Sequence, residues 1–224
     1  MPLPDSADPV ITASLGTAGV AGWMAVTQRA AVTPGEAVVV RGASGAAGRI
    51  AVQAARAAGA SRVIGVGRAG SRLAAVEHLC DATVEEGDDL GPRIAEAAGG
   101  PVPVMIDFMW GPAAGGALTA LAPGGRVVLA GGGAGTLAEV ASPVMIGRRL
   151  EIRGYSNFGL SPQEFAAALL ELVGLAGAGS LDVAVTAVPL ERAAEAWQGT
   201  RDSTGKFVID LRVGAHGQGA TGEA

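Results

Sequence analysis

The sequence predicts an α/β fold with a doubly wound, mostly parallel sheet of six strands and helices on both faces. Two observations lead to this prediction. Short β-branched runs alternate with longer helical segments, which is the order expected of a parallel sheet whose strands are connected by helices. A glycine-rich turn at 42–48 also joins a buried-type apolar run to a helix of small residues.

The expected elements follow in chain order. A helix of small residues over 11–29 enters the fold, and a turn at 33–35 precedes the first strand. The six numbered strands are expected at 37–41, 62–66, 83–84, 102–108, 126–130 and 150–155, and a last strand is expected at 206–211. Helices are expected at 46–58, 71–79 with Ser71 as N-cap, 89–98, 113–121, 162–174 after the N-cap Ser161, and 190–198. Residues 1–9 are expected to form a lead, 10–213 a single nucleotide-binding domain, and 214–224 a disordered tail.

Composition narrows the class of protein. Hydrophobic residues make up 49% of the 224 residues and aromatic residues only 4%, so the core must consist mainly of Ala, Val, Leu and Ile. The net charge of −5 and the lack of a basic cluster argue against nucleic-acid binding. No apolar run was expected to reach the length of a membrane span, and no secretory signal is evident. The single cysteine, Cys80, is compatible with a reducing compartment, so we expect a cytoplasmic protein.

The turn at 42–48 carries the strongest functional signal. Gly42, Gly45 and Gly48 recur at three-residue intervals, which allows a sharp turn and a close approach of a diphosphate. The helix that follows would direct its free N–H groups and positive dipole end at those phosphates. The pattern A-x-G-x-x-G from Ala43 departs from the strict fingerprint, but its place between a strand and a helix strengthens it. The alternative is a glycine-rich turn that binds no ligand.

The end of the second strand bears on the choice of cofactor. NAD-selective domains place a carboxylate there for the ribose hydroxyls, whereas this chain has Gly67 followed by Arg68, and then Arg72. Two guanidinium groups can hold a 2′-phosphate through charge-assisted, bidentate bonds. We therefore predict that the cofactor is NADP(H). The alternative is that Arg68 and Arg72 are ordinary solvated surface charges.

Several segments resemble the medium-chain dehydrogenase/reductase superfamily on its quinone oxidoreductase side. They are GWMAV (22–26), TPGEAVVVRGASGAAG (33–48), AVQAARAAGASRVIGVG (51–67), IDFMWG (106–111), LAPGGRVVLAGG (121–132) and GKFVIDL (205–211). The resemblance covers about 10–213 and implies a Rossmann cofactor-binding domain. Members of that family also carry a preceding GroES-like barrel that forms one wall of the active-site cleft. We expect this chain to lack that barrel.

The glycine turn, the end of the second strand and the resemblance together indicate a set of cofactor-binding residues. They are Ser44, Gly45, Ala46, Ala47, Gly48, Gly67, Arg68, Arg72, Phe108, Trp110, Gly131 and Gly132. Ligands of such sheets bind outside the carboxyl ends of the strands, where these residues are expected. For Trp110, a place in the core or in an apolar lid is an equal alternative. The catalytic residue is unknown; Tyr155 is a candidate general acid, with a purely structural tyrosine as the alternative.

A catalytic metal is not expected. His78 and Cys80 are two residues apart in an expected helix, so their side chains point to different faces and cannot close a tetrahedral site. In the zinc-dependent members of the family that this chain resembles, most of the residues that bind the zinc ion come from the barrel. We therefore expect a zinc-independent protein, and we see no Ser-His-Asp arrangement.

Three functions remain open from the sequence. The first is an NADPH-dependent reductase of the quinone or enone type, or its cofactor-binding half, acting on a small-molecule substrate. The second is a non-catalytic NADP(H)-binding subunit or sensor. The third is a repurposed crevice that catalyses a cyclisation or isomerisation in natural-product biosynthesis. An open cleft would need a cover, which a partner protein, a second copy of this chain or a small substitute lid would have to supply. The resemblance also implies a homodimer through the edge strand 149–155, which begins at Arg149 and ends at Tyr155.

Overall fold

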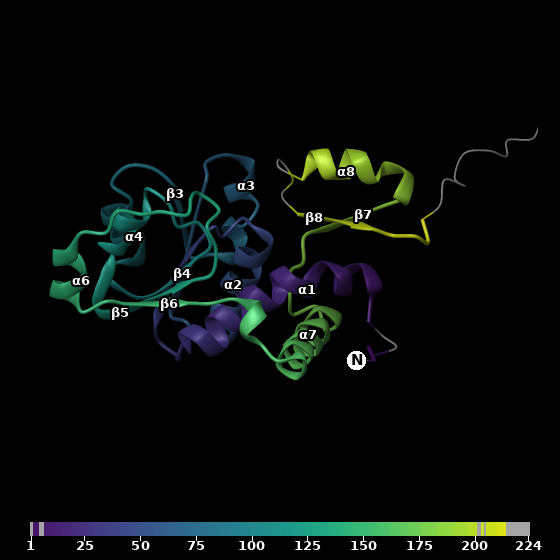
Figure 1. The fold of residues 1–224 in the computed structure, drawn as a ribbon, viewed down its shortest axis with the longest axis horizontal. Coiled ribbons are helices and arrows are strands. Elements are labelled where there is room, and N and C mark those ends of the chain that lie inside the picture. The colour runs from purple at the N-terminus through teal and green to yellow at the C-terminus, as the bar shows by residue number, and fades with distance from the viewer. Residues whose placement is uncertain (1, 5–6, 201–202, 204, 214–224) are drawn as a thin grey trace, which may run out of the picture.

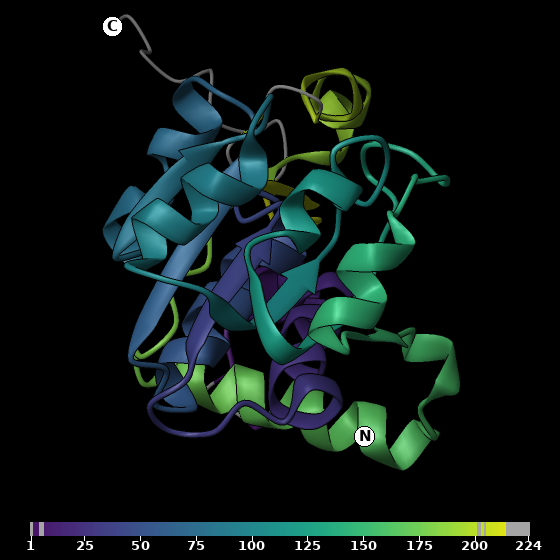
Figure 2. The same cartoon turned by 90° about the vertical axis from the view of Figure 1, so that its left-hand side faces the viewer.

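The computed structural model describes residues 2–4, 7–200, 203 and 205–213. The predicted disordered tail at 214–224 and part of the predicted lead at 1–9 lie outside the described residues. The main body is a six-stranded sheet in the order β3-β2-β1-β4-β5-β6 (Figure 1). All neighbouring strands in it are parallel, and Figure 2 shows helices on both of its faces. The predicted fold class is confirmed.

The elements of this sheet have the following bounds. Its strands are β1 (Ala37–Arg41), β2 (Arg62–Gly67), β3 (Ala82–Glu85), β4 (Val102–Asp107), β5 (Leu121–Leu129) and β6 (Glu151–Gly154). Its helices are α1 (Pro9–Met24), α2 (Ala46–Ala57), α3 (Ser71–Ala74), α4 (Leu90–Ala98), α5 (Ala114–Leu118), α6 (Ser142–Arg148) and α7 (Pro162–Gly177). Short helical turns lie at Ala25–Ala30 (π), Glu77–Leu79 and Asn157–Gly159.

Strand β1 lies between two apolar layers. Val38 and Val40 belong to the core cluster that contains α1, α2 and α7, whereas Val39 belongs to the cluster that contains α4 and α5. All three valines are fully buried. Because both faces of the strand are covered, its sequence shows no alternation of apolar and polar residues.

The entry helix is longer and more apolar than we expected from the sequence. Asp8 caps α1 by accepting hydrogen bonds from the backbone N–H groups of Val10 and Ile11, and the helix kinks at Gly16. Together with the π-turn it runs over Pro9–Ala30, 22 residues with a mean hydropathy of 1.4, which is enough to cross a membrane by length and composition. Our expectation that no apolar segment reaches that length is therefore corrected. Within this fold α1 packs against α2 and α7 as a core helix.

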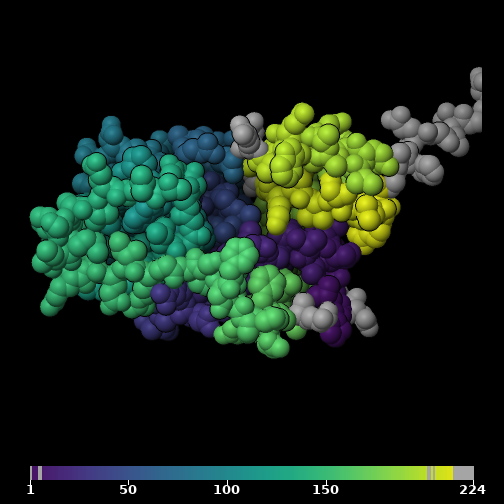
Figure 3. All heavy atoms as spheres, in the orientation of Figure 1, coloured from purple at the N-terminus to yellow at the C-terminus, as the bar shows by residue number. Residues whose placement is uncertain are grey.

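Residues after α7 form a separate small lobe. It consists of β7 (Val185–Val188), a short turn at Leu190–Arg192, α8 (Ala193–Gly199) and β8 (Lys206–Ile209). Strands β7 and β8 form their own two-stranded parallel sheet. In Figure 3 this lobe (yellow) rests on α1 (purple). The strand expected at 206–211 therefore forms, but it does not join the main sheet; β7 and α6 were not expected.

Three expected boundaries also differ from the structure. Strand β5 begins at Leu121 rather than at 126, because Leu121 pairs with Val102 across a register shift in β4. The preceding helix α5 accordingly ends at Leu118. Ser71 is the first residue of α3, and Gly70 occupies the N-cap without a side-chain bond. Ser161, by contrast, caps α7 as expected and forms a capping box with Glu164.

Candidate functional site

A cavity of about 640 Å³ opens at the carboxyl ends of the central strands. We call this cavity the crevice. Its lining brings together most of the predicted cofactor residues with several others. The lining residues are Ala18, Gly42, Ser44, Gly45, Ala46, Ala47, Gly48, Gly67, Arg68, Arg72, Glu86, Phe108, Met109, Gly133 and Ala134.

The glycine-rich turn forms one wall of the crevice. Gly42 has a φ of +84°, a conformation that favours glycine. A Cβ atom on Gly48 would lie 2.0 Å from the carbonyl oxygen of Gly42, so α2 can begin this close to the turn only with glycine there. Gly45 is the N-cap of α2 and supplies no side-chain cap. The first N–H groups of α2 have no intrahelical partners, and they lie in a cradle that fits an anionic diphosphate.

Two arginines lie at the end of the crevice next to β2. Gly67 is the last residue of β2, and Arg68 follows it on the exposed surface. Arg72 is half-buried in α3 and lines both the crevice and a second pocket described below. The absence of a carboxylate directly after β2 fits the sequence prediction. However, Glu86, which follows β3, also lines this end, and the sequence reasoning had missed it.

Glu86 belongs to a buried ionic cluster below the crevice. Arg41, the last residue of β1, is fully buried and forms ion pairs with both Glu86 and Asp107. Its Nη1 atom lies 2.7 Å from Oδ2 of Asp107. The other carboxylate oxygen of Asp107 accepts hydrogen bonds from the backbone N–H groups of Met109 and Trp110 at 2.8 and 2.9 Å. The cluster therefore links the ends of β1, β3 and β4 and fixes the loop after β4.

Three of the predicted cofactor residues lie outside the crevice lining. Trp110 adopts a left-handed conformation with a φ of +48° and forms a bridge with Gly135. Gly131 packs so closely against Phe108 that a Cβ atom on residue 131 would lie 2.7 Å from the Phe108 carbonyl oxygen. Gly132 is likewise absent from the lining, and Gly133 and Ala134 take their place. The path of this loop depends on contacts distant in sequence, so no local signal could have given the shift.

Tyr155 lies in a different cavity, together with Gln28, Arg29 and Leu160. Its hydroxyl donates to Oδ1 of Asn157 at 2.8 Å, and the Asn157 amide donates to the Thr17 carbonyl oxygen, also at 2.8 Å. Burial raises the pKa of Tyr155 to about 12, which makes the hydroxyl a weaker acid than usual. In this arrangement Tyr155 ties the end of β6 to α1.

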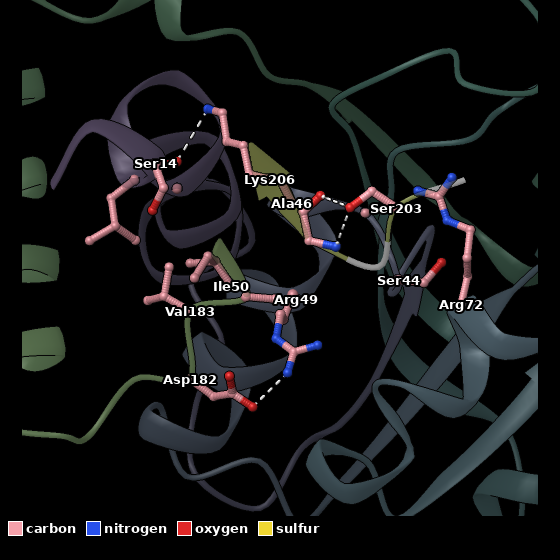
Figure 4. A pocket seen from close by; sticks show the side chains of 15 residues that line it. Ser14, Ser44, Ala46, Arg49, Ile50, Arg72, Asp182, Val183, Ser203 and Lys206 are labelled. Carbon is pink, nitrogen blue, oxygen red and sulfur yellow. Dashed lines mark hydrogen bonds and ion pairs between the residues drawn. The ribbon is translucent and has the colours of Figure 1, made fainter. Parts of the chain in front are cut away.

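A smaller pocket lies between the glycine turn and the small lobe (Figure 4). We call it the inter-lobe pocket. Arg49 of α2 forms an ion pair with Asp182 at 2.6 Å, and Lys206 of β8 donates to the Ser14 carbonyl oxygen at 3.2 Å. Ser203, whose hydroxyl donates to the Gly205 carbonyl oxygen at 2.8 Å, lines the same pocket. Asp182, Ser203 and Lys206 are far from the glycine turn in sequence, so no local pattern connects them with it.

The residues of the described chain do not fit a zinc ion. Across the described ranges, no group of three or more His, Cys, Asp or Glu side chains is placed to hold a metal. The His78 ring lies 2.8 Å from a carboxylate oxygen of Asp182. Burial raises the pKa of the Cys80 thiol to about 11, which disfavours the thiolate that binds zinc.

Comparisons with known proteins agree with this geometry. The family model for the zinc-binding dehydrogenases matches residues 46–174. The chain is 29% identical over 223 residues to the probable NADPH-dependent quinone reductase tdiC of Emericella nidulans, covering 92% of this chain and 62% of that protein. Among solved structures, AibC superposes with a TM-score of 0.80 at 31% identity, covering 92% of this chain and 57% of that chain. A quinone oxidoreductase of Pseudomonas syringae pv. Tomato DC3000 gives a TM-score of 0.80 at 25% identity, covering 93% and 67%.

These coverages show that the match extends over only part of each relative. The chain spans only 62% of the length of the tdiC protein and 57% of AibC. The family model extends from the start of α2 into α7 and includes strands β2 to β6. The chain belongs to the zinc-binding dehydrogenase family of the medium-chain dehydrogenase/reductase superfamily, as a quinone oxidoreductase-like Rossmann domain.

Proposed function

We propose that the chain binds NADP(H) and forms the cofactor-binding part of a zinc-independent oxidoreductase that reduces quinones or enones. One observation carries this proposal. The N-terminus of α2 and the side chains of Arg68 and Arg72 line the same crevice, so a diphosphate and a 2′-phosphate can be held together. The similarity to the probable NADPH-dependent quinone reductase tdiC of Emericella nidulans, at 29% identity, supports the assignment.

The residues of the crevice have separable roles in this proposal. The N–H groups at the start of α2 and the Ser44 hydroxyl would hold the diphosphate. Arg68 and Arg72 would hold the 2′-phosphate. Phe108 and Met109 would form the apolar wall toward the nicotinamide end.

The bound cofactor would supply a hydride from its nicotinamide ring to a conjugated carbonyl compound. The protein's part is then to orient the two reactants and to exclude water. Neither task requires a metal or a strong general acid, which agrees with the position of Tyr155 outside the crevice.

A partner chain is proposed to cover the open side of the crevice. The small lobe exposes large apolar side chains. Trp197 is 82% exposed, and Leu190 and Leu211 are also exposed. Large exposed apolar side chains of this kind favour a protein contact. We place the protein in the cytoplasm, and we also propose a homodimer through the open edge of β6.

A second candidate function is a cofactor-holding subunit that has no turnover of its own, and the exposed apolar side chains of the small lobe favour it. Oxidation of NADPH by a panel of quinones and enones, followed at its nicotinamide absorbance, separates the two functions. Substrate-dependent oxidation by the purified chain supports the reductase. Tight binding of NADPH with no oxidation across the panel supports the subunit, and product formation without net NADPH loss would indicate the repurposed crevice.

A further inference from the structure

The sulfur atom of Met109 lies where the glycine turn meets the loop after β5. A Cβ atom added to Gly42 of the turn, or to Gly133 of the loop, would lie 3.3 Å from Sδ of Met109. Both glycines line the crevice, as Met109 does. The thioether is therefore seated between two backbone segments that carry no side chain at these points, on the wall of the candidate cofactor site.

Hydrogen bonds hold the backbone of Met109 on both sides. Its N–H donates to Oδ1 of Asp107 at 2.8 Å, and its carbonyl oxygen accepts from the N–H of Ala134 at 2.7 Å. Asp107 is itself buried and paired with Arg41. Because the backbone is anchored in this way, a chemical change at the sulfur alters the wall of the crevice rather than moving the residue away from it.

Met109 also differs from the other methionines in the described part of the chain. Met24 and Met105 are buried, at 9% and 0% exposed. Met109 and Met145 are half-buried, and Met145 packs from α6 against the core. Of these four, Met109 alone lines the crevice. A dissolved oxidant reaches a half-buried sulfur more readily than a fully buried one, so Met109 is the methionine whose oxidation would act on the crevice.

We propose that Met109 is an oxidation site at which hydrogen peroxide weakens cofactor binding. The inference rests on the proposed function, because it takes the crevice to bind NADP(H). The peroxide transfers one oxygen atom to the thioether: its O–O bond breaks, an S–O bond forms, the sulfur is oxidised by two electrons, and water leaves. The proposed reaction itself supplies the oxidant. A hydroquinone product that passes two electrons and two protons to dioxygen returns to the quinone and forms hydrogen peroxide.

The sulfoxide oxygen has no room on the glycine side of the sulfur. The contacts at Gly42 and Gly133 already fill the space there, so the oxygen must point into the crevice or displace the loop. The sulfoxide is also polar, and it replaces part of the apolar wall that Phe108 and Met109 form. A dinucleotide that enters must then displace water from the sulfoxide or lie further from the wall, and both reduce its affinity.

The experiment uses the full chain as wild type, Met109→Leu and Met145→Leu, untreated and after exposure to hydrogen peroxide followed by its removal. Leucine and methionine have similar volumes, so both substitutions conserve packing. Peptide mass spectrometry locates the added oxygen, and calorimetry gives the affinity for NADPH, with each variant compared with itself before treatment. Peroxide should weaken NADPH binding roughly 10-fold in wild type and in Met145→Leu. In Met109→Leu the ratio should stay near one, because leucine offers no sulfur. The two methionine sulfoxide reductases, one for each epimer, should restore wild type.

Failure of the inference and failure of the proposed function give different results. An unchanged NADPH affinity of wild type after complete oxidation of Met109 would overturn the inference, as would oxidation of Met109 no faster than that of Met105. Equal weakening in Met109→Leu would also overturn it. If the untreated, folded chain binds no NADPH, the proposed function itself fails and the inference with it.

Should Met109→Leu not fold, wild type alone supplies the test. Saturating NADP⁺ should slow the oxidation of Met109 and leave that of Met145 unchanged, because only Met109 lines the crevice among the two. Equal rates at Met109 with and without NADP⁺ would overturn the inference.

Discussion

Arg41 and Asp107 are paired across the carboxyl ends of β1 and β4, with Nη1 of the arginine 2.7 Å from Oδ2 of the aspartate and both side chains buried. β1 leads directly into the glycine turn, and β4 leads into the loop that carries Phe108 and Met109. The pair therefore fixes two walls of the crevice relative to each other. Glu86 extends the same cluster to the end of β3.

Replacing Arg41 with Met should destabilise the fold strongly. The substitution leaves the buried carboxylate of Asp107 and the partly buried carboxylate of Glu86 without their cation, which costs about 3–5 kcal/mol in comparable cases. Urea unfolding measures the loss. Arg153→Met is the control, since Arg153 pairs with Glu151 at the surface and its loss should cost about 1 kcal/mol or less. Equal effects of the two substitutions would contradict the account.

Replacing Gly48 with Ala should abolish the close packing of α2 on the turn. The new Cβ atom would lie 2.0 Å from the Gly42 carbonyl oxygen, so the backbone must shift. We expect a loss of about 1–3 kcal/mol in stability and at least tenfold weaker NADPH binding. Gly174→Ala in α7 is the matched control, because its Cβ would meet open space and should stabilise the helix by about 0.5–1 kcal/mol. NADPH binding by Gly48→Ala at the wild-type affinity would refute the cradle.

Replacing Arg68 with Ser should reduce the affinity for NADPH by roughly tenfold and leave the affinity for NADH unchanged. The reason is that only NADPH carries the 2′-phosphate. Fluorescence titration with each dinucleotide gives the two dissociation constants, and Arg153→Ser, remote from the crevice on β6, controls for the loss of one positive charge. Equal weakening of both dinucleotides would show that Arg68 does not read the phosphate.

Acid should weaken the fold through Glu36. Both oxygens of this carboxylate accept from Arg126, at 2.8 and 2.6 Å, and this bonding lowers the pKa of Glu36 from 4.5 to about 2. Because the folded state holds the proton less tightly, the contribution is present above pH 4.5 and is lost as the pH falls from 4.5 toward 2. Urea unfolding of wild type and Glu36→Gln across this range should show a stability difference that shrinks below pH 4.5. A difference that stays constant down to the lowest pH would exclude this linkage.

The homodimer proposal has a direct test at the edge of the sheet. Strand β6 pairs with β5 on one side only, and Ile152 on β6 is partly exposed. Light scattering at micromolar concentration should give the mass of a dimer for wild type and of a monomer for Ile152→Lys. Leu190→Lys, on the exposed surface of the small lobe, should remain dimeric. A monomeric wild-type chain would rule the proposal out.

The sheet and the turn were predictable because their signals are local. Val38, Val39 and Val40 are all apolar because both faces of β1 are covered, and the three glycines follow within one turn. Gly48 can be recognised in the sequence by its spacing, although the 2.0 Å approach that requires it is visible only in the structure.

The other parts of the fold and of the site could not be predicted, because they depend on contacts between segments that are distant in sequence. Glu86 reaches the crevice only because β3 lies beside β2, and its partner Arg41 is 45 residues away in sequence. Lys206 was predicted in a strand, but nothing near it in sequence shows that this strand pairs with β7 and contacts α1. Gly133 and Ala134 line the crevice in place of the predicted Gly131 and Gly132. This shift follows from the path of the loop after β4, which Asp107 fixes.

Calorimetric titration of the purified, folded chain with NADPH tests the central claim most directly. The account predicts saturable binding at one site per chain, lost or strongly weakened in Gly48→Ala and retained in Gly174→Ala. No heat with either NADPH or NADH at millimolar concentration, from a chain shown to be folded, would contradict it.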